Sequence, residues 1–319
     1  MRYNSVKKYL KILSAMVITS STLIGLSIIN KVINIHAVSK NLLHTKGTKK
    51  FVWKFGDITY RKKGTGTPIL LVHSLDAAAS SVEWSKIINR LSKRHTVYAM
   101  DLLGCGLSEK PIMTYTNHIF SQLINDFIKI VIGKRTTVIS SGNSSSFVIS
   151  ACDNDNSLFE KIVLISPEEL QKGSLIPGKR AKSYKAILSM SIIGNLLYNI
   201  AVLKINIKHN MALNFYRKGK LTDEMIDKYY ESSHRGLSPK SLYSSLVCHY
   251  TNKNIKFELS QIDNSIILVE GCNNKNFVNV IKEYTSINPA IESISIENSI
   301  KYPHIENEGE FLKALNIYL

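Results

Sequence analysis

The first 56 residues of this chain contain no acidic residue, and several residue types are scarce throughout. The four cysteines lie far apart without a C-x-x-C pair, which excludes a thioredoxin-type or zinc motif and a disulfide framework. Seven prolines and 16 glycines are too few for a collagen-like or linker-dominated chain. We expect no metal or cofactor, because no ligand or phosphate-binding pattern is present. What remains is ordinary globular composition, with 44% hydrophobic and 20% charged residues among 319.

The net charge of +17 is concentrated at one end of the chain. Residues 1–50 hold nine lysines and arginines and no acid, so the rest of the chain carries only +8. About half of the excess therefore flanks one apolar segment, where positive charge lies beside anionic lipid headgroups. This distribution favours a membrane surface as the partner of the basic residues, and we expect no nucleic-acid partner.

That apolar segment covers residues 12–29, which are uncharged and follow a basic cluster. At about 1.5 Å per residue, it nearly spans a hydrocarbon core of about 30 Å. We therefore predict an uncleaved signal anchor over residues 1–35 and a basic linker over residues 36–50. The basic cluster predicts a cytoplasmic N-terminus with the body outside the membrane. Cleavage near the poor site Ile35-His36-Ala37 would instead give a secreted protein.

The body begins with a hairpin pattern over residues 51–63 and then changes to alternating strand and helix patterns. Short apolar runs predict buried strands over residues 68–72, 96–100, 136–140, 161–165, 265–270 and 291–296. Helical patterns fall between or after them, over residues 77–91, 115–132, 143–152, 276–285 and 308–318. This alternation predicts an α/β domain with a doubly wound, mostly parallel sheet and a ligand crevice at the carboxyl ends of its strands.

One stretch interrupts this alternation. Residues 169–258 show helical patterns near 181–204, 222–234 and 239–249 and no clear strand, which predicts an inserted helical lid. The α/β core is then expected to consist of residues 51–168 and 259–319. The apolar run from Ile187 to Leu203 is suited to ordinary packing of the lid, and alternatively to a pocket roof or a membrane-facing surface.

Five short segments occur in an order typical of one superfamily. They are PILLVHS (68–74), DLLGCGLSEKP (101–111), VLISP (163–167), LVEG (268–271) and YPHIE (302–306). Residues 51–319 thereby resemble the α/β-hydrolase superfamily, in the lid-bearing branch of esterases, epoxide hydrolases and haloalkane dehalogenases. The resemblance implies that His73, Ser74 and Asn143 shape the oxyanion and pocket region.

The residue at the expected nucleophile position is not a nucleophile. The resemblance implies a tight turn between strand and helix with the pattern small-x-nucleophile-x-small. An alignment without gaps puts Ser140 and Ser144 at the small positions and Gly142 at the nucleophile position. A register shifted by two residues makes Ser144 the nucleophile instead. Gly142 is the favoured reading, because the shifted register needs a longer strand and a compensating deletion.

The other two triad positions are also altered. The resemblance implies an acid at Asn274 and a histidine base at Lys301. An asparagine cannot stabilise an imidazolium by charge, and a lysine with an ordinary pKa near 10.4 holds its proton at neutral pH. Hydrolysis would need Ser144 with His304 or Lys301 as base. We therefore expect a binding module for a small apolar ligand or a partner; the alternative is a hydrolase of esters or similar small apolar substrates.

Overall fold

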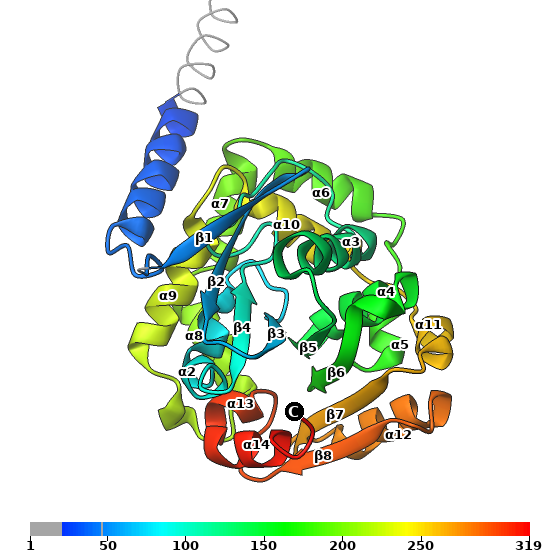
Figure 1. Cartoon of the computed structure of the whole chain (residues 1–319). Helices are drawn as coiled ribbons and strands as arrows, with labels where there is room; N and C mark the ends of the chain where they lie inside the picture. Colours follow the sequence, from blue (N-terminus) through cyan, green and yellow to red (C-terminus); the bar gives the residue numbers. More distant parts are fainter. Residues whose placement is uncertain (1–20, 46) are drawn as a thin grey trace, which may run out of the picture.

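The computed structural model describes residues 21–45 and 47–319 (Figure 1). Its centre is one eight-stranded sheet with the order β1-β2-β4-β3-β5-β6-β7-β8. The strands are β1 Thr48–Trp53, β2 Gly56–Lys63, β3 Thr67–Val72, β4 His95–Met100, β5 Thr136–Ser141, β6 Phe159–Ile165, β7 Ser265–Gly271 and β8 Glu292–Ile296. β2 pairs antiparallel with β1 and β4, and all the other pairs are parallel. The predicted α/β class, the hairpin and the doubly wound sheet are confirmed.

The central strands are buried on both faces, because successive side chains point to opposite sides of the sheet. In β3, Leu70 and Val72 join one hydrophobic cluster, whereas Ile69 and Leu71 join a second. Helices cover both clusters, as α/β layering requires. The flanking helices are α2 Ile88–Leu91, α3 Asn117–Phe127, α4 Ser145–Asn154, α12 Phe277–Ile287, α13 Pro303–Glu306 and α14 Glu308–Leu315.

The predicted helix over residues 77–91 is wrong in its first half. The chain there forms a loop, then a 3-10 helix Ser81–Lys86, and then the short α2. The Asp76 carboxylate accepts a hydrogen bond of 2.8 Å from the backbone N–H of Ala78, a local bond that competes with helix formation. Helical structure begins only after Ser80, whose side chain caps the 3-10 helix.

A series of helices connects β6 to β7, and we call it the inserted helices. It consists of α5 Leu170–Gly173, α6 Ala181–Ser189, α7 Ile193–Ala201, α8 Lys204–Leu213, α9 Asp223–His234, α10 Pro239–Val247 and α11 Lys256–Gln261. Within this stretch the structure has no strand, as the sequence pattern indicates. A third hydrophobic cluster joins the inserted helices to the loop Ala77–Ala79 after β3. The inserted helices therefore roof the carboxyl end of the sheet.

The described part of the N-terminal segment is a helix over Ser21–Val38, with a mean hydropathy of 1.3 and 11% of that stretch buried. It extends from the body (Figure 1). This helix is long and apolar enough to cross a membrane, although a signal sequence has the same properties. The basic cluster before the apolar segment and residues 12–20 lie outside the described residues. The apolar helix also continues past Ile29, where the uncharged run ends.

Candidate functional site

The turn between β5 and α4 lies at the carboxyl end of the sheet and is built around Gly142. Its φ of 58° is left-handed, which glycine adopts without the steric cost that a side chain adds. A Cβ atom at this position would lie 2.5 Å from Ser74 Oγ and 3.2 Å from Ser74 Cβ. The turn therefore has the backbone of a nucleophile elbow, but the Ser74 side chain fills the space beside it.

Ser144 lies two residues further on, at the N-terminus of α4, with helical φ and ψ of −66° and −15°. Its side chain is fully buried, and its Oγ donates a hydrogen bond of 2.7 Å to the backbone carbonyl of His73. This hydroxyl is thus engaged in holding the loop after β3 against α4. Among the described residues, no basic side chain forms a hydrogen bond with it.

The backbone donors of the loop after β3 also have partners inside the protein. The Leu75 N–H donates to Asn143 Oδ1 at 2.8 Å, and the Asn143 amide returns a bond of 3.0 Å to the Leu75 carbonyl. The Ser74 N–H donates to Glu83 Oε2 at 3.0 Å. In an α/β-hydrolase, backbone N–H groups of this loop donate hydrogen bonds to the developing oxyanion. Here the N–H groups of Ser74 and Leu75 both donate to protein side chains instead.

The His73 ring forms hydrogen bonds with the backbone of this loop and of Leu102, as a neutral imidazole. Its Nε2 accepts the Leu102 N–H at 3.0 Å, so its proton lies on Nδ1, which donates to the Ser74 carbonyl at 2.8 Å. His73 is fully buried. The structure therefore brings together His73, Ser74 and Asn143, the three residues that the sequence assigns to the oxyanion region, in one hydrogen-bonded cluster.

Asn274 and Lys301 lie on the other side of Gly142, in the same cavity of about 260 Å³. The Asn274 side chain donates to Glu270 Oε2 at 3.3 Å. Lys301 remains exposed and makes no ion pair within the described chain. Partial desolvation, and then the charge of Lys172, lower the pKa of Lys301 despite nearby carboxylates. The three triad-equivalent positions thus meet at one cavity.

His304 belongs to α13, does not line this cavity and is fully buried. Its Nε2 is 3.1 Å from Glu83 Oε1, both side chains are buried, and its ring lies 4.8 Å from that of Trp84. Burial would raise the pKa of Glu83, but the hydrogen bond and charge of His304 outweigh it and hold that pKa below its usual value. The structure shows no contact between His304 and Ser144 among its described residues.

Sequence reasoning missed Glu270, the carboxyl group at the end of β7. Burial raises its pKa to about 7, although hydrogen bonds from Asn274 and Ser166 and the charge of Lys301 oppose the shift. The available signal was a charged residue at the end of the apolar run that begins at Ile266. The LVEG motif identifies Glu270 only as the end of a strand, and does not show that its carboxyl group accepts a hydrogen bond from Asn274.

The cavity at the triad positions is lined mainly by polar groups. It contains the Glu168–Lys172 ion pair of 3.1 Å, and the residues that line it are Ser74, Ser141, Gly142, Asn143, Ser166, Pro167, Glu168, Glu169, Lys172, Asn214, Asn274, Asn276, Val280, Lys301 and Tyr302. This lining is more polar than a site for a purely apolar ligand needs.

A second cavity of about 300 Å³ lies between the loop after β3 and the inserted helices. Ser74, Asn214 and Tyr302 line both cavities, so the two adjoin. We call this pair of cavities the crevice. Its second half is more apolar, with Ala77, Ala78, Ala79, Val202, Ile207 and Met211 in the wall.

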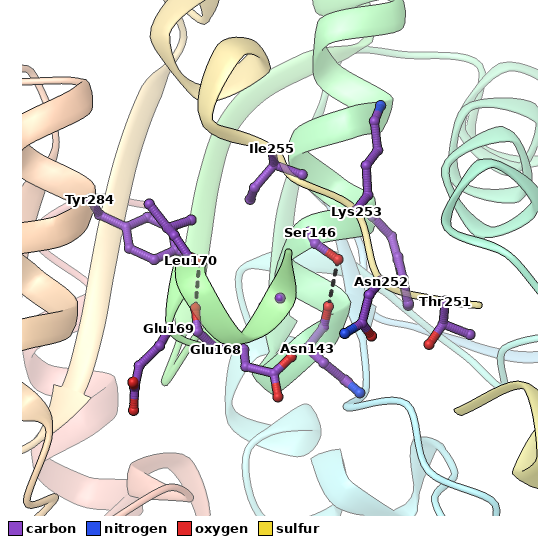
Figure 2. Close-up of a pocket in the computed structure, with 12 residues that line it drawn as sticks. Asn143, Ser146, Glu168, Glu169, Leu170, Thr251, Asn252, Lys253, Ile255 and Tyr284 are labelled. Carbon is purple, nitrogen blue, oxygen red and sulfur yellow. Dashed lines mark hydrogen bonds between the residues drawn. The ribbon is translucent and has the colours of Figure 1, made fainter. Parts of the chain in front are cut away.

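A much smaller pocket of about 20 Å³ lies behind Asn143 and Glu168 (Figure 2). Figure 2 shows the two hydrogen bonds that hold its walls, from Ser146 Oγ to the Asn143 carbonyl and from the Tyr284 hydroxyl to the Glu168 carbonyl. Its volume is enough for about one water molecule. Of these three spaces, only the two cavities of the crevice have room for a ligand of organic size.

Sequence comparisons point to one fold. The model of the α/β hydrolase fold family matches residues 67–167. A protein of Mycobacterium tuberculosis, named as uncharacterized, is 27% identical over 107 residues, which are 34% of this chain and 31% of that protein. The 2-hydroxy-6-oxo-6-(2'-aminophenyl)hexa-2,4-dienoic acid hydrolase of Metapseudomonas resinovorans is 38% identical over 71 residues, 22% of this chain and 24% of the hydrolase. These matches span at most about a third of the relatives' length.

Solved structures extend the similarity to most of the chain. A serine hydrolase involved in carbazole degradation superposes with a TM-score of 0.70 and 17% identity, covering 85% of this chain and 97% of its own. A meta-cleavage product hydrolase from Pseudomonas fluorescens superposes with a TM-score of 0.67 and 14% identity, covering 85% and 96%. Together with the matched family model, these similarities show that this chain has the α/β-hydrolase fold.

Proposed function

We propose that this protein is a membrane-anchored binding module that holds a small ligand in the crevice and does not hydrolyse it. The observation that carries the proposal is the left-handed Gly142, with Ser74 in the space where a nucleophile's side chain would begin. Nucleophilic acyl transfer needs an activated hydroxyl, a base within reach and free oxyanion donors. The solved structures of similar fold that are named above are hydrolases. The proposed difference in function therefore rests on the residues of the site and not on the fold.

The Ser74 hydroxyl, which faces the crevice beside Gly142, has no base as its hydrogen-bond partner. Ser74 Oγ donates to Asn143 Oδ1 at 3.3 Å, and an amide oxygen cannot remove a proton as a histidine does. Lys301 and Asn274 supply hydrogen-bond donors to the crevice. These groups are suited to hold polar parts of a ligand, while the Ala77–Ala79 wall accommodates an apolar part.

A serine-directed fluorophosphonate tests this proposal on the full chain in detergent micelles. We expect no labelling of the wild type, of Ser144→Ala or of Ser74→Ala, while a carboxylesterase added to the same sample is labelled. Labelling that disappears only in Ser144→Ala would establish the alternative hydrolase that uses Ser144. Labelling that disappears only in Ser74→Ala would identify the crevice hydroxyl as a nucleophile and also overturn the proposal.

The membrane anchor is the second part of the proposal, and the helix Ser21–Val38 supports it. This helix is largely exposed, and the inserted helices beside it carry exposed apolar side chains, including Ile193, Leu197 and Ile200 of α7. A carbonate wash of membranes tests the anchor. We expect the full-length chain to stay with the membrane, with its body outside; release of a shortened chain would mean that the segment is a cleaved signal.

A further inference from the structure

Asp76 presents a carboxylate to the second cavity of the crevice. It lies in the loop after β3, where Oδ1 accepts the Ala78 N–H at 2.8 Å, and its side chain remains exposed to the cavity space. Within residues 21–45 and 47–319, it makes no ion pair with a lysine, arginine or histidine. Protein atoms nonetheless surround it, and this burial raises the pKa of Asp76. The carboxylate thus faces the cavity without a partner of opposite charge.

Three tyrosines line the same cavity as this carboxylate. They are Tyr229 of α9, Tyr243 of α10 and Tyr302 before α13. Burial raises the pKa of each hydroxyl, and the charge of Asp76 raises it further, as it does for Tyr198 behind them. In the described structure, none of the three lining hydroxyls has a hydrogen-bond partner. The cavity therefore combines aromatic rings, free hydroxyls and the Asp76 carboxylate.

The charge of this cavity is opposite to that of the whole protein. Its ionisable lining residues, besides the tyrosines, are Asp76 and Glu83, and Glu83 already faces His304. No lysine or arginine lines it, although the chain carries a net charge of +17. Because no basic side chain lines this cavity, the charge of the Asp76 carboxylate is not compensated there. An uncompensated negative charge favours a cationic ligand.

We propose that this cavity binds a small organic ammonium ion, held by the Asp76 carboxylate and the surrounding tyrosine rings. The proposal deepens the proposed function, on which it rests, by naming the chemical class of the ligand. Aromatic faces attract organic cations through the ring quadrupole, and the effect grows when the site is desolvated. A hard metal ion would need several oxygen ligands, and the described residues contain no cluster of three acidic, histidine or cysteine side chains.

Calorimetric titration of the full chain in detergent micelles with choline tests this inference. Dimethylbutanol, the neutral carbon isostere of choline, is the matched ligand. We expect choline to bind at least about tenfold more tightly than dimethylbutanol, because only choline gains from the carboxylate and the ring quadrupoles. Asp76→Asn should weaken choline by at least about tenfold, since its amide oxygen still accepts the Ala78 N–H but its charge is gone.

Three further variants serve as controls in the same titration: two at Tyr243 and one at an exposed acid. Tyr243→Phe keeps the ring and should leave choline affinity within about threefold, whereas Tyr243→Leu should weaken it by about fivefold. Asp263→Asn removes an exposed carboxylate outside the crevice and should leave the affinity for choline unchanged.

The outcomes separate this inference from the proposed function. If both ligands bind equally well, or if Asp76→Asn leaves choline affinity unchanged, the ammonium site is refuted while ligand binding in the crevice stands. If choline does not bind the folded chain, the ammonium site is refuted as well. Fluorophosphonate labelling that depends on Ser144 or Ser74 would refute the proposed function independently of either result.

Discussion

The replacement of Gly142 by alanine tests the geometry of the turn at the candidate site most directly. A left-handed backbone costs a residue with a Cβ about 1–2 kcal/mol. The new methyl group would also lie 2.5 Å from Ser74 Oγ, which must rotate and give up its bond to Asn143. Losing that bond costs about 1 kcal/mol. We therefore expect Gly142→Ala to lower the free energy of unfolding by about 2–3 kcal/mol.

A double-mutant cycle separates the two contributions. Ser74→Ala removes the hydroxyl and leaves a tolerable Cβ contact of 3.2 Å, so in this background Gly142→Ala should cost about 1 kcal/mol less. Urea unfolding of the full chain in micelles, followed by the fluorescence of its two tryptophans, measures all four variants. A coupling near zero would show that Ser74 does not occupy the space beside the turn. A neutral Gly142→Ala would refute the left-handed conformation itself.

Three further predictions concern buried polar groups. Ser144→Ala should lower the free energy of unfolding by about 1–2 kcal/mol in urea, because the buried His73 carbonyl loses its donor. Glu83→Gln should destabilise by about 1–3 kcal/mol in the same assay, since it removes the buried carboxylate that lies 3.1 Å from His304 Nε2. Glu270 has a pKa raised from 4.5 to about 7, so its contribution to stability is present below pH 4.5 and is lost as the pH rises through 7. Wild-type Tm should therefore fall more between pH 5 and pH 8 than that of Glu270→Gln, by the equivalent of about 2–3 kcal/mol.

The controls for these three changes come from the same chain. Ser260→Ala removes an exposed hydroxyl and should be neutral, so equal losses in Ser260→Ala and Ser144→Ala would contradict the role of the buried bond. A Glu83→Gln chain as stable as the wild type would show that the pair with His304 is not charged. Parallel Tm profiles of wild type and Glu270→Gln would contradict the raised pKa of that carboxyl group.

The sheet was predictable because its strands are apolar on both faces. The run from Ile69 to Val72 is continuous and can lie only between two helical layers, and the same holds for the strands before Ser141 and after Ser265. The loop over residues 77–80, where a helix was expected, was not predictable from local propensity. The three alanines favour a helix, but the Asp76 turn and the packing of Ala77–Ala79 against the inserted helices overrode that preference.

At the site, the sequence indicated which residues lie together but not how they pair. Gly142, Asn274 and Lys301 meet at one cavity, and motif spacing was enough to predict that because each follows the carboxyl end of a strand. The pairing of Glu83 with His304 and the exposure of Asp76 to the cavity depend on side-chain directions across elements far apart in the chain. No periodicity or motif carries that information.

The N-terminal helix forms hydrogen bonds with the inserted helices. The Asn30 amide donates to the Ile192 carbonyl at 3.1 Å and accepts from the Asn199 amide at 2.8 Å, in a buried contact with α7. The Leu42 N–H then donates to the buried Glu231 of α9 at 2.6 Å.

These attachments connect the N-terminal helix to the wall of the crevice, because α7 and α9 contribute Ala201 and Tyr229 to that wall. The same helix also leads along the chain into β1. With the membrane anchor proposed above, a tilt of the helix in the bilayer would therefore shift the crevice wall and the first strand of the sheet together.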